Sequence, residues 1–556
     1  MHGLMMDFQL SIPAMARRAE QMHPGKSIVS RQPDKTVHRT TYGECLPRAH
    51  RLAGALRELG VRDDDRVATL CWNHHQHFEA YVGIPSMGAV LHTLNIRLHA
   101  DELAYIVAHA ADKIVIVDRS LLPLLEQFRH RTKLEHVIVV GAGAGADTPP
   151  WAHDYETLIA SAPELPFDES IDERRASSMC YTSGTTGRPK AVLYSHRSTV
   201  LHSLACGLWD CELVREREVV MPVVPMFHAN AWGLPFTCLL LGASQVLPGP
   251  YVDAESLLGL MAAERVTVAS GVPTVWLAVL QALDASPGAY DLSTLRALFS
   301  GGASVPESLI RAFEERHGLA VIQGWGMTET SPVATLATLN SGLAAADSAT
   351  RFRARATAGR PLPFIETRVR ADAGIAPRDG ATMGELEIRG PWVTSGYYAA
   401  DDSAARFTDD GWFRTGDLVT MDAAGYVTIR DRAKDVIKSG GEWISSVALE
   451  NALMKHPAVA EAAVIGLAHP KWDERPLALI VPRAGAACAA AELAAHLAPD
   501  FARFWIPSAF EIVPAIPRTS VGKVNKLALR AQYRDYFMPA QALANLAASP
   551  ASSLTS

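Results

Sequence analysis

The sequence predicts an α/β protein: a large N-terminal part of helix-covered sheets with a small barrel-like β region, followed by a small α+β domain. The first observation is the alternation of strand and helix signals over about 430 residues, which is typical of helix-covered parallel sheets. The second is a change of composition near residue 430. The third is the length of 556 residues, which exceeds one compact core at roughly 150 residues per domain.

In the N-terminal part, apolar residues at helical spacing predict helices, and short apolar runs predict buried strands. The helices are expected at Tyr42–Leu59 and Phe78–Gly88. The strands are expected at Arg66–Cys71, Lys113–Val117, Thr267–Ser270, Leu295–Ser300 and Val321–Gly324. This alternation favours a parallel sheet with helices on its faces.

A hairpin-rich β region is expected at roughly 356–430, with a strand at Gly425–Ile429, and it completes an N-terminal domain at 1–430. A hinge is expected at 431–435, a C-terminal domain at 436–538 and a frayed tail at 539–556. The expected elements of the C-terminal domain are helices at Ser446–His456 and Ala490–Ala498 and strands at Val459–Gly466, Leu477–Val481 and Ala509–Val513.

Composition excludes several classes of protein. The net charge of −7 argues against a general nucleic-acid-binding protein, which normally shows a basic surface. Seven scattered cysteines without a C-x-x-C pair disfavour a disulfide framework and a structural zinc site. Apolar runs stay below the roughly 18 residues that cross a bilayer, and the N-terminus has the wrong charge order for a secretory signal. We expect a cytoplasmic enzyme.

The most prominent motif is Tyr181–Lys190, which reads YTSGTTGRPK. It holds five hydroxyl side chains, two glycines and a lysine within ten residues. Glycines let backbone N–H groups approach a ligand, and the hydroxyls and lysine add donors, so the loop suits a polyphosphate. The Walker pattern does not fit it. The alternative is a flexible surface turn.

Two further motifs could complete a nucleotide site. In GWGMTET, at Gly324–Thr330 after a strand, Trp325 could stack on a base and Glu329 could hold a magnesium ion. In FRTGDL, at Phe413–Leu418, Asp417 could accept ribose hydroxyls from a turn between strands. The structural alternatives are a tight turn with a packed tryptophan and an Asx-turn.

Two charged stretches, DRAKDVIKSGGE at Asp431–Glu442 and PRTSVGKVNK at Pro517–Lys526, would each alone be a solvated linker or an exposed turn. In this order, however, the five motifs resemble the adenylate-forming superfamily of acyl-CoA synthetases, firefly luciferase and peptide-synthetase adenylation domains, up to about residue 537. The chain is most similar to bacterial medium- and long-chain fatty-acyl-CoA synthetases at Val223–Pro235, Ala269–Trp276, Ile437–Ser446, His469–Pro476 and Ile516–Lys523.

The resemblance implies an ATP-dependent ligase in which a carboxylate attacks the α-phosphorus of Mg-ATP and the thiol of CoA then attacks the acyl-AMP. It implies catalytic roles for Lys523, Glu329, Thr185 and Lys438, with Thr185 and Glu329 sharing the Mg²⁺ ion. The implied nucleotide-binding residues are Thr182, Ser183, Gly184, Thr185, Thr186, Gly187, Lys190, Gly302, Gln323, Gly324, Trp325, Gly326, Thr328, Asp417 and Arg432.

The resemblance also implies that the small C-terminal domain is mobile, with its hinge at Lys434. Its rotation would withdraw Lys523 from the nucleotide and bring up the segment Lys438–Trp443. The implied CoA-binding residues are Ser439, Gly440, Gly441, Glu442 and Trp443. The family further suggests a homodimer.

The implied acyl-binding residues are His228, Trp232 and Gly301, and Trp232 matches a residue that gates the acyl tunnel of long-chain relatives. A core tryptophan is the structural alternative. The segment Met226–Trp232 lacks the Asp with which peptide-synthetase domains hold an amino group. We therefore expect a medium- or long-chain fatty acid, with a short acid such as methylthiopropionate, or an aryl or cyclic acid, as the alternative.

Two other classes remain open: a non-catalytic acyl-nucleotide-binding protein and a luciferase-like oxidase. The presence of Lys523, Glu329 and Lys190 argues against the first. The histidine-rich segment Trp72–His77 could suggest a metal site, but its spacing favours a structural role. Cys180 is expected to be a small buried thiol rather than a nucleophile.

Overall fold

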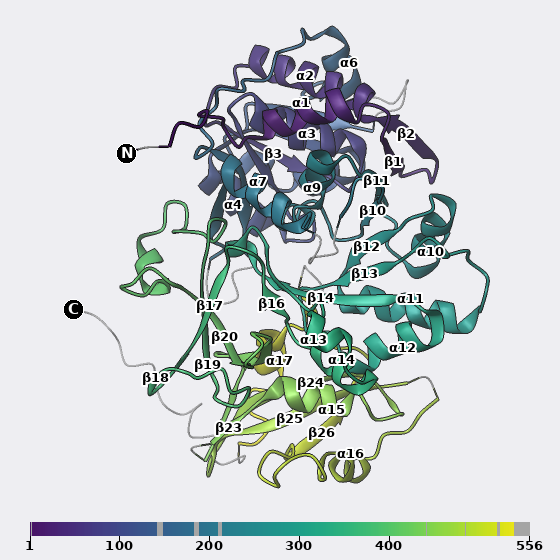
Figure 1. Cartoon of the computed structure of the whole chain (residues 1–556), viewed down its shortest axis with the longest axis vertical. Coiled ribbons are helices and arrows are strands. Elements are labelled where there is room, and N and C mark those ends of the chain that lie inside the picture. The colour runs from purple at the N-terminus through teal and green to yellow at the C-terminus, as the bar shows by residue number, and fades with distance from the viewer. Residues whose placement is uncertain are drawn as a thin grey trace. The chain divides into compact units, whose positions relative to one another are not determined.

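The computed structural model of the chain (Figure 1) describes residues 1, 3–141, 148–182, 188–208, 214–440, 442–483, 485–519 and 523–538. The expected tail at 539–556 lies outside these residues. The chain divides into two compact units: unit 1 comprises Met1–Thr367 and Glu387–Arg414, and unit 2 comprises Arg368–Leu386 and Thr415–Ser556. Neither boundary falls at 430, so the expected two-domain division and the hinge at 431–435 stay predictions.

A nine-stranded sheet forms one half of unit 1, in the order β16-β15-β14-β13-β12-β10-β11-β1-β2. Its central strands are parallel, and antiparallel strands close both edges. Its strands are β1 (Ser27–Arg31), β2 (Val37–Thr41), β10 (Val219–Pro222), β11 (Ser244–Leu247), β12 (Val268–Gly271), β13 (Ala297–Ser300), β14 (Ala320–Gly326), β15 (Val333–Leu336) and β16 (Arg360–Pro361).

A seven-stranded sheet forms the other half, in the order β7-β6-β5-β3-β4-β8-β9. It is parallel except for β9, which runs antiparallel to β8. Its strands are β3 (Arg66–Leu70), β4 (Val90–Thr93), β5 (Asp112–Asp118), β6 (His136–Val140), β7 (His153–Asp154), β8 (Ala176–Tyr181) and β9 (Ala191–Ser195).

Helices cover both sheets of unit 1, as Figure 1 shows for α10, α11 and α12 beside β12–β14. Apolar side chains of these helices and strands form one buried cluster around Trp276 and Phe313. The helices of unit 1 are α1 (Ile12–Met22), α2 (Tyr42–Glu58), α3 (His75–Ser86), α4 (Ala100–Ala110), α5 (Leu122–Glu126), α6 (Tyr155–Ser161), α7 (His196–Cys206), α8 (Ala229–Trp232), α9 (Leu234–Leu241), α10 (Ala254–Ala263), α11 (Pro273–Ala285), α12 (Glu307–His317), α13 (Ser341–Ala344) and α14 (Ser348–Arg355).

The hairpin-rich region forms a five-stranded sheet in the order β18-β17-β19-β20-β21. Its strands are β17 (Glu366–Ala371), β18 (Gly374–Ile375), β19 (Gly384–Arg389), β20 (Phe413–Met421) and β21 (Val427–Arg432). The rest of unit 2 contains β22 (Ile437–Ser439), β23 (Glu442–Ile444), β24 (Val459–His469), β25 (Asp473–Pro482) and β26 (Ala509–Ile512), with α15 (Ser446–Leu453), α16 (Ala490–Leu497) and α17 (Lys526–Gln532).

The structure confirms the expected α/β fold, and several details differ from the sequence-based expectations. In unit 2, β25 begins four residues early, β24 ends three residues late and α15 ends three residues early. Helix α3 begins at His75, three residues early, because the His74 side chain accepts the N–H of His77 and caps it. Strand β14 continues through Gly326, and β21 begins at Val427 and runs to Arg432. Asp417 lies inside β20 rather than in a turn, because it pairs with Arg432 of β21 in the sheet.

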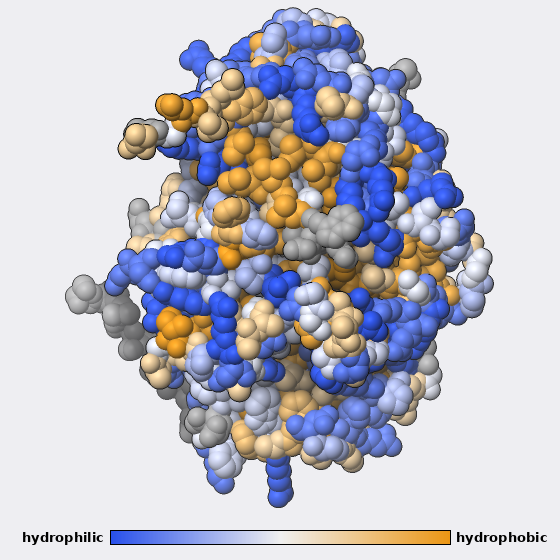
Figure 2. Space-filling view, in the orientation of Figure 1, coloured by the Kyte–Doolittle hydropathy of each residue, from blue (hydrophilic) through white to orange (hydrophobic). Residues whose placement is uncertain are grey.

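The surface of unit 1 carries an apolar patch around α7 and α9 (Figure 2). Leu204 and Leu208 are 44% and 45% exposed, and Leu193 of β9 is 39% exposed. Among the described residues, no helix is long and apolar enough to cross a membrane.

Candidate active site

The carboxyl ends of β12, β13 and β14 lie side by side in the nine-stranded sheet, where open α/β sheets usually bind ligands. At the end of β14, Trp325 pairs with Thr335 of β15. A Cβ on Gly326 would lie 1.8 Å from the carbonyl oxygen of Pro332, so only glycine fits there. Residues Thr328–Thr330 then form a short 3₁₀ turn, η4, that carries Glu329.

Glu329 is almost fully buried and is held by two hydrogen bonds from one segment. The Tyr397 hydroxyl donates to its Oε1 over 2.7 Å, and the Thr394 N–H donates to its backbone oxygen over 2.7 Å. The Tyr194 hydroxyl donates to the neighbouring Thr328 carbonyl over 2.7 Å. A carboxylate is a ligand type that Mg²⁺ prefers beside phosphate oxygens, so Glu329 fits the predicted metal role.

The base of the expected phosphate loop is closed by its two end residues. The Thr182 N–H donates to the Lys190 carbonyl over 2.8 Å, and the Lys190 N–H donates to Thr182 Oγ1 over 3.3 Å. The Lys190 ammonium lies 5.1 Å from the centre of the Tyr397 ring, so Lys190 and Glu329 contact the same tyrosine. The expected phosphate-binding residues Ser183, Gly184, Thr185, Thr186 and Gly187 lie outside the described residues.

The segment after β13 is tied to β14 by Gln323. Its side chain is 4% exposed, and its Oε1 accepts the Val305 N–H over 2.7 Å. Gly302 within this segment has a φ of +80°, which favours glycine. Gln323 and Gly302, both predicted to flank the adenine, therefore lie on adjacent strand ends.

The expected acyl-binding segment contains a left-handed turn. The φ angles of Ala229, Asn230, Ala231 and Trp232 are 44°, 53°, 49° and 58°. This conformation costs an L-residue about 1–2 kcal/mol. Asn230 offsets part of that cost, because its buried amide donates to Ser178 Oγ over 2.8 Å and accepts from the Cys180 thiol over 3.3 Å. Cys180 is thus the buried thiol that the sequence predicts.

The left-handed turn presents Trp232 to Gly301. A Cβ on Gly301 would lie 3.1 Å from Trp232 Cη2 and 3.0 Å from the Gly324 carbonyl oxygen. His228 begins the turn by accepting the Ala231 N–H over 3.1 Å. The structure thus brings two expected acyl-binding residues, Trp232 and Gly301, against Gly324 of the expected nucleotide site.

Unit 2 holds the expected ribose-binding pair. The Arg432 guanidinium lies 2.5 Å from Asp417 Oδ1, and the Asp417 side chain is 2% exposed against 38% for Arg432. After β21, Lys434 lies in the turn before β22, and burial lowers its pKa. Asp435 of this turn accepts from Arg530 of α17 over 2.7 Å.

The expected CoA-binding segment is the β22–β23 hairpin of unit 2. Lys438 lies opposite Trp443 in the hairpin, with its ammonium 5.2 Å from the indole centre, and Trp443 is 44% exposed. Ser439 accepts from Arg475 over 3.1 Å, and the Gly440 N–H donates to the Trp472 carbonyl over 2.8 Å. Gly441 and the side chain of Glu442 lie outside the described part of the chain.

Lys523 lies in unit 2, shortly before α17. Its N–H donates to Thr519 Oγ1 over 3.2 Å, and its carbonyl accepts the Thr519 N–H over 2.7 Å. Next to Lys523, Val524 forms a β-bridge with Arg518, and Arg518 forms an ion pair with Glu461 over 2.7 Å.

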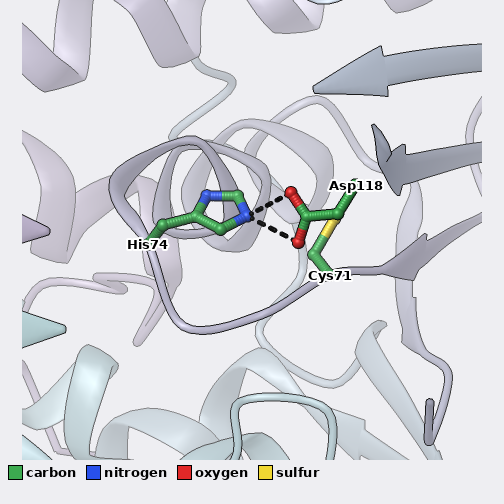
Figure 3. A group of neighbouring side chains, drawn as sticks. All are labelled: Cys71, His74 and Asp118. Carbon is green, nitrogen blue, oxygen red and sulfur yellow. Dashed lines mark hydrogen bonds and ion pairs between the residues drawn. The ribbon is translucent and has the colours of Figure 1, made fainter. Parts of the chain in front are cut away.

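His74 of the histidine-rich segment lies in a buried cluster with Cys71 and Asp118 (Figure 3). His74 Nδ1 accepts the His77 N–H, so Nε2 carries the proton and donates to Asp118 over 3.0 Å. A histidine that binds a metal through Nε2 needs its proton on the other nitrogen. The Cys71 thiol donates to the Ile116 carbonyl. This hydrogen bonding explains the cluster as structural, as the sequence spacing favours.

Sequence reasoning missed Tyr397 and Tyr194, which hold the turn of Glu329. Tyr397 stands in the run SGYY at 395–398, about 70 residues after Glu329 in the chain. A glycine before paired tyrosines is a weak local signal, and only the fold brings these residues together.

The chain is similar to known proteins over almost its whole length. Residues 16–398 match the sequence profile of the family described as AMP-binding enzyme, and residues 448–523 match that of the AMP-binding enzyme C-terminal domain. The chain is 48% identical to a long-chain-fatty-acid–CoA ligase of Thermus thermophilus, covering 96% of this chain and 97% of the relative. It is 44% identical to a 3-methylmercaptopropionyl-CoA ligase of Ruegeria pomeroyi, covering 96% and 99%.

A third relative, a medium-chain-fatty-acid–CoA ligase of Ectopseudomonas oleovorans, is 40% identical over 97% of this chain and 98% of its own length. Among solved structures, the anthranilate CoA ligase AuaEII in complex with anthranoyl-AMP superposes with a TM-score of 0.83 at 25% identity, covering 95% of this chain and 98% of that one. ATP-bound MatB from Rhodopseudomonas palustris superposes with a TM-score of 0.82 at 28% identity, covering 95% and 100%.

Proposed function

This chain belongs to the AMP-binding enzyme family and is an AMP-forming acyl-CoA ligase, and from this premise we propose that its substrate is a medium- or long-chain fatty acid. The observation that carries the proposal is the packing of Trp232 against Gly301 beside the apolar core of unit 1. An indole against a glycine at the end of a sheet suits a gated apolar tunnel rather than a polar head-group site.

A shorter acid is the second candidate, because 3-methylmercaptopropionyl-CoA ligases are 44% and 42% identical to this chain. Both candidates use the same adenylation chemistry and differ in the depth of the acyl pocket. The aryl and cyclic acids remain a third alternative with weaker support.

For the first half-reaction, we propose that Thr182–Lys190 cradles the β- and γ-phosphates and that Trp325, Gln323, Gly302, Gly324 and Gly326 surround the adenine. Asp417 and Arg432 would hold the ribose, and Thr328 would contact the α-phosphate or the substrate carboxylate. Lys523 would bridge the attacking carboxylate and the α-phosphate, stabilising charge that develops in the transition state. Glu329, with Thr185, would hold the Mg²⁺ ion, which neutralises phosphate charge when bound.

For the second half-reaction, we propose that the C-terminal domain after the hinge, at 436–538, turns about Lys434, so that Lys523 leaves and the Lys438–Trp443 hairpin approaches the acyl-AMP. Ser439, Gly440, Gly441, Glu442 and Trp443 would then line the path of CoA, and Lys438 would assist thioester formation. Lys434 supports this role because it lies in the turn that joins β21 to β22. We also infer, from the family resemblance alone, a cytoplasmic homodimer, which sedimentation would test.

The test is release of AMP and pyrophosphate from ATP, with and without CoA, across a panel of acids. The panel contains straight-chain acids from acetate to palmitate, methylthiopropionate, benzoate and several amino acids. We expect CoA-dependent AMP release with a maximum at a medium or long chain. A maximum at methylthiopropionate or benzoate would refute the fatty-acid proposal, while leaving the ligase chemistry in place.

A further inference from the structure

Tyr397 contacts both charged groups that the proposed function assigns to metal–ATP. Its hydroxyl donates to Glu329 Oε1 over 2.7 Å. The face of its ring lies 5.1 Å from the Lys190 ammonium. Tyr397 is 8% exposed and Glu329 is 5% exposed, so the hydrogen bond forms where little water competes for it.

The backbone around Tyr397 is hydrogen-bonded to the segments that carry Glu329 and Lys190. The Thr394 N–H donates to the Glu329 carbonyl over 2.7 Å, and the Tyr398 N–H donates to the carbonyl of Ala191, next to Lys190, over 2.9 Å. Thr394 Oγ1 also donates to the Gly396 carbonyl over 2.6 Å, which tightens the loop between the anchors. Tyr397 is therefore fixed between the Glu329 turn and the end of the phosphate loop.

The hydrogen bond joins the phenol hydroxyl, as donor, to one oxygen of the carboxyl group. Because this bond uses Oε1, it restrains the rotation of the Glu329 carboxylate.

We propose that Tyr397 is a positioning residue that orients Glu329 towards the divalent cation of metal–ATP and holds Lys190 through its ring. The proposal rests on the proposed function, since that function gives Glu329 and Lys190 their ligands. Hydrogen-bonding partners of metal ligands commonly change metal affinity about 10- to 100-fold. The hydroxyl and the ring can be tested separately, because phenylalanine removes only the first.

The first experiment measures Mn²⁺ binding in the presence of ATP and the absence of any acid, by the loss of the free Mn²⁺ signal in electron paramagnetic resonance. We expect Tyr397→Phe to weaken Mn²⁺ binding about 10- to 100-fold. Glu329→Gln is the reference, and the double variant should bind no more weakly than Glu329→Gln alone, because both changes remove one interaction. Tyr398→Phe is the matched control and should bind Mn²⁺ as the wild type does.

The second experiment measures ATP affinity without metal, in EDTA, by calorimetry. Tyr397→Phe keeps the ring under Lys190 and should leave this affinity unchanged, whereas Tyr397→Leu should weaken it several-fold. Circular dichroism checks that both variants fold. Equal affinities for the Phe and Leu variants would refute the role of the ring.

The outcomes separate this proposal from the proposed function. Unchanged Mn²⁺ binding in Tyr397→Phe, with weakened binding in Glu329→Gln, would overturn the role of Tyr397 and leave Glu329 as the metal ligand. Unchanged binding in both variants would overturn the metal assignment as well. The acid panel is independent of either result.

Discussion

At the scale of single residues, Lys523 is assigned to only one half-reaction. We predict that Lys523→Ala lowers acyl-AMP formation at least about 100-fold, because a charge-stabilising donor is worth about 2.7–4 kcal/mol in a preorganised site. Transfer of a supplied acyl-AMP to CoA should remain largely intact. Separate assays of the two half-reactions measure this, and equal loss in both would contradict the assignment.

Trp232 gives a second residue-scale prediction. Trp232→Ala should shift the chain-length profile, because the indole that faces Gly301 would no longer close the expected acyl site. Relative kcat/KM across the straight-chain acids measures the shift. Trp151→Ala is the matched control. Trp151 is partly exposed at the surface, and the Arg129 guanidinium lies over its ring. An unchanged profile in Trp232→Ala would make Trp232 a core residue only.

Some residues of the candidate site could be predicted from the sequence and others could not. The expected acyl pair Trp232 and Gly301 meets in the structure, and the sequence pointed to both residues through the resemblance to a known family. Tyr397 could not be predicted, because its proposed role depends on a hydrogen bond to Glu329, which is 68 positions away in the chain. Asp417 was expected in a turn, and its place inside β20 depends on pairing with β21, which local sequence does not specify.

At the scale of elements, the turn between β21 and β22 carries the expected hinge. We predict that Lys434→Pro slows transfer to CoA about tenfold, corresponding to ~1.4 kcal/mol, and affects adenylation less, because proline fixes φ. Lys434→Ala is the control that removes the side chain and leaves the backbone free. If Lys434→Pro leaves thioester formation at the wild-type rate, the hinge lies elsewhere, such as at the boundary near residue 414.

Element positions were the most predictable part of the fold. The apolar runs in β3, β5, β12 and β13 and the helical spacing in α2 predicted these elements to within two residues. The start of α3 was missed because a histidine supplies its N-cap, a role usually taken by Ser, Thr, Asp or Asn. The left-handed turn at 229–232 was missed because Ala and Trp disfavour positive φ, and a single Asn does not signal four such residues in a row.

At the scale of the whole molecule, buried neutral histidines couple stability to pH. Burial lowers the pKa of His196 and His202, both in α7, to about 4. The unfolded chain binds these protons near pH 6.5, so stability is lost as pH falls from about 6.5 to about 4. Each of the two histidines therefore lowers the free energy of unfolding by about 2 kcal/mol when the pH falls from 7 to 5.

His202→Gln tests this coupling, since a glutamine oxygen can still accept the Val333 N–H that His202 Nε2 accepts over 3.3 Å. Between pH 7 and pH 5, we expect the free energy of unfolding to fall by about 2 kcal/mol less in the variant than in the wild type. Urea titrations at the two pH values measure it. A variant with the wild-type pH dependence would show that His202 is protonated without cost in the folded protein.

The left-handed turn at 229–232 bears on how this enzyme would respond to laboratory evolution. Glycine relieves positive φ angles, so selection for heat tolerance should favour it at Ala229 and Ala231, and each change needs one nucleotide. The survivors would carry Trp232 on a looser backbone. If Trp232 closes the acyl site as proposed, variants selected for heat tolerance should accept a wider range of acids. Sequencing the selected variants and measuring their acid profiles would test this.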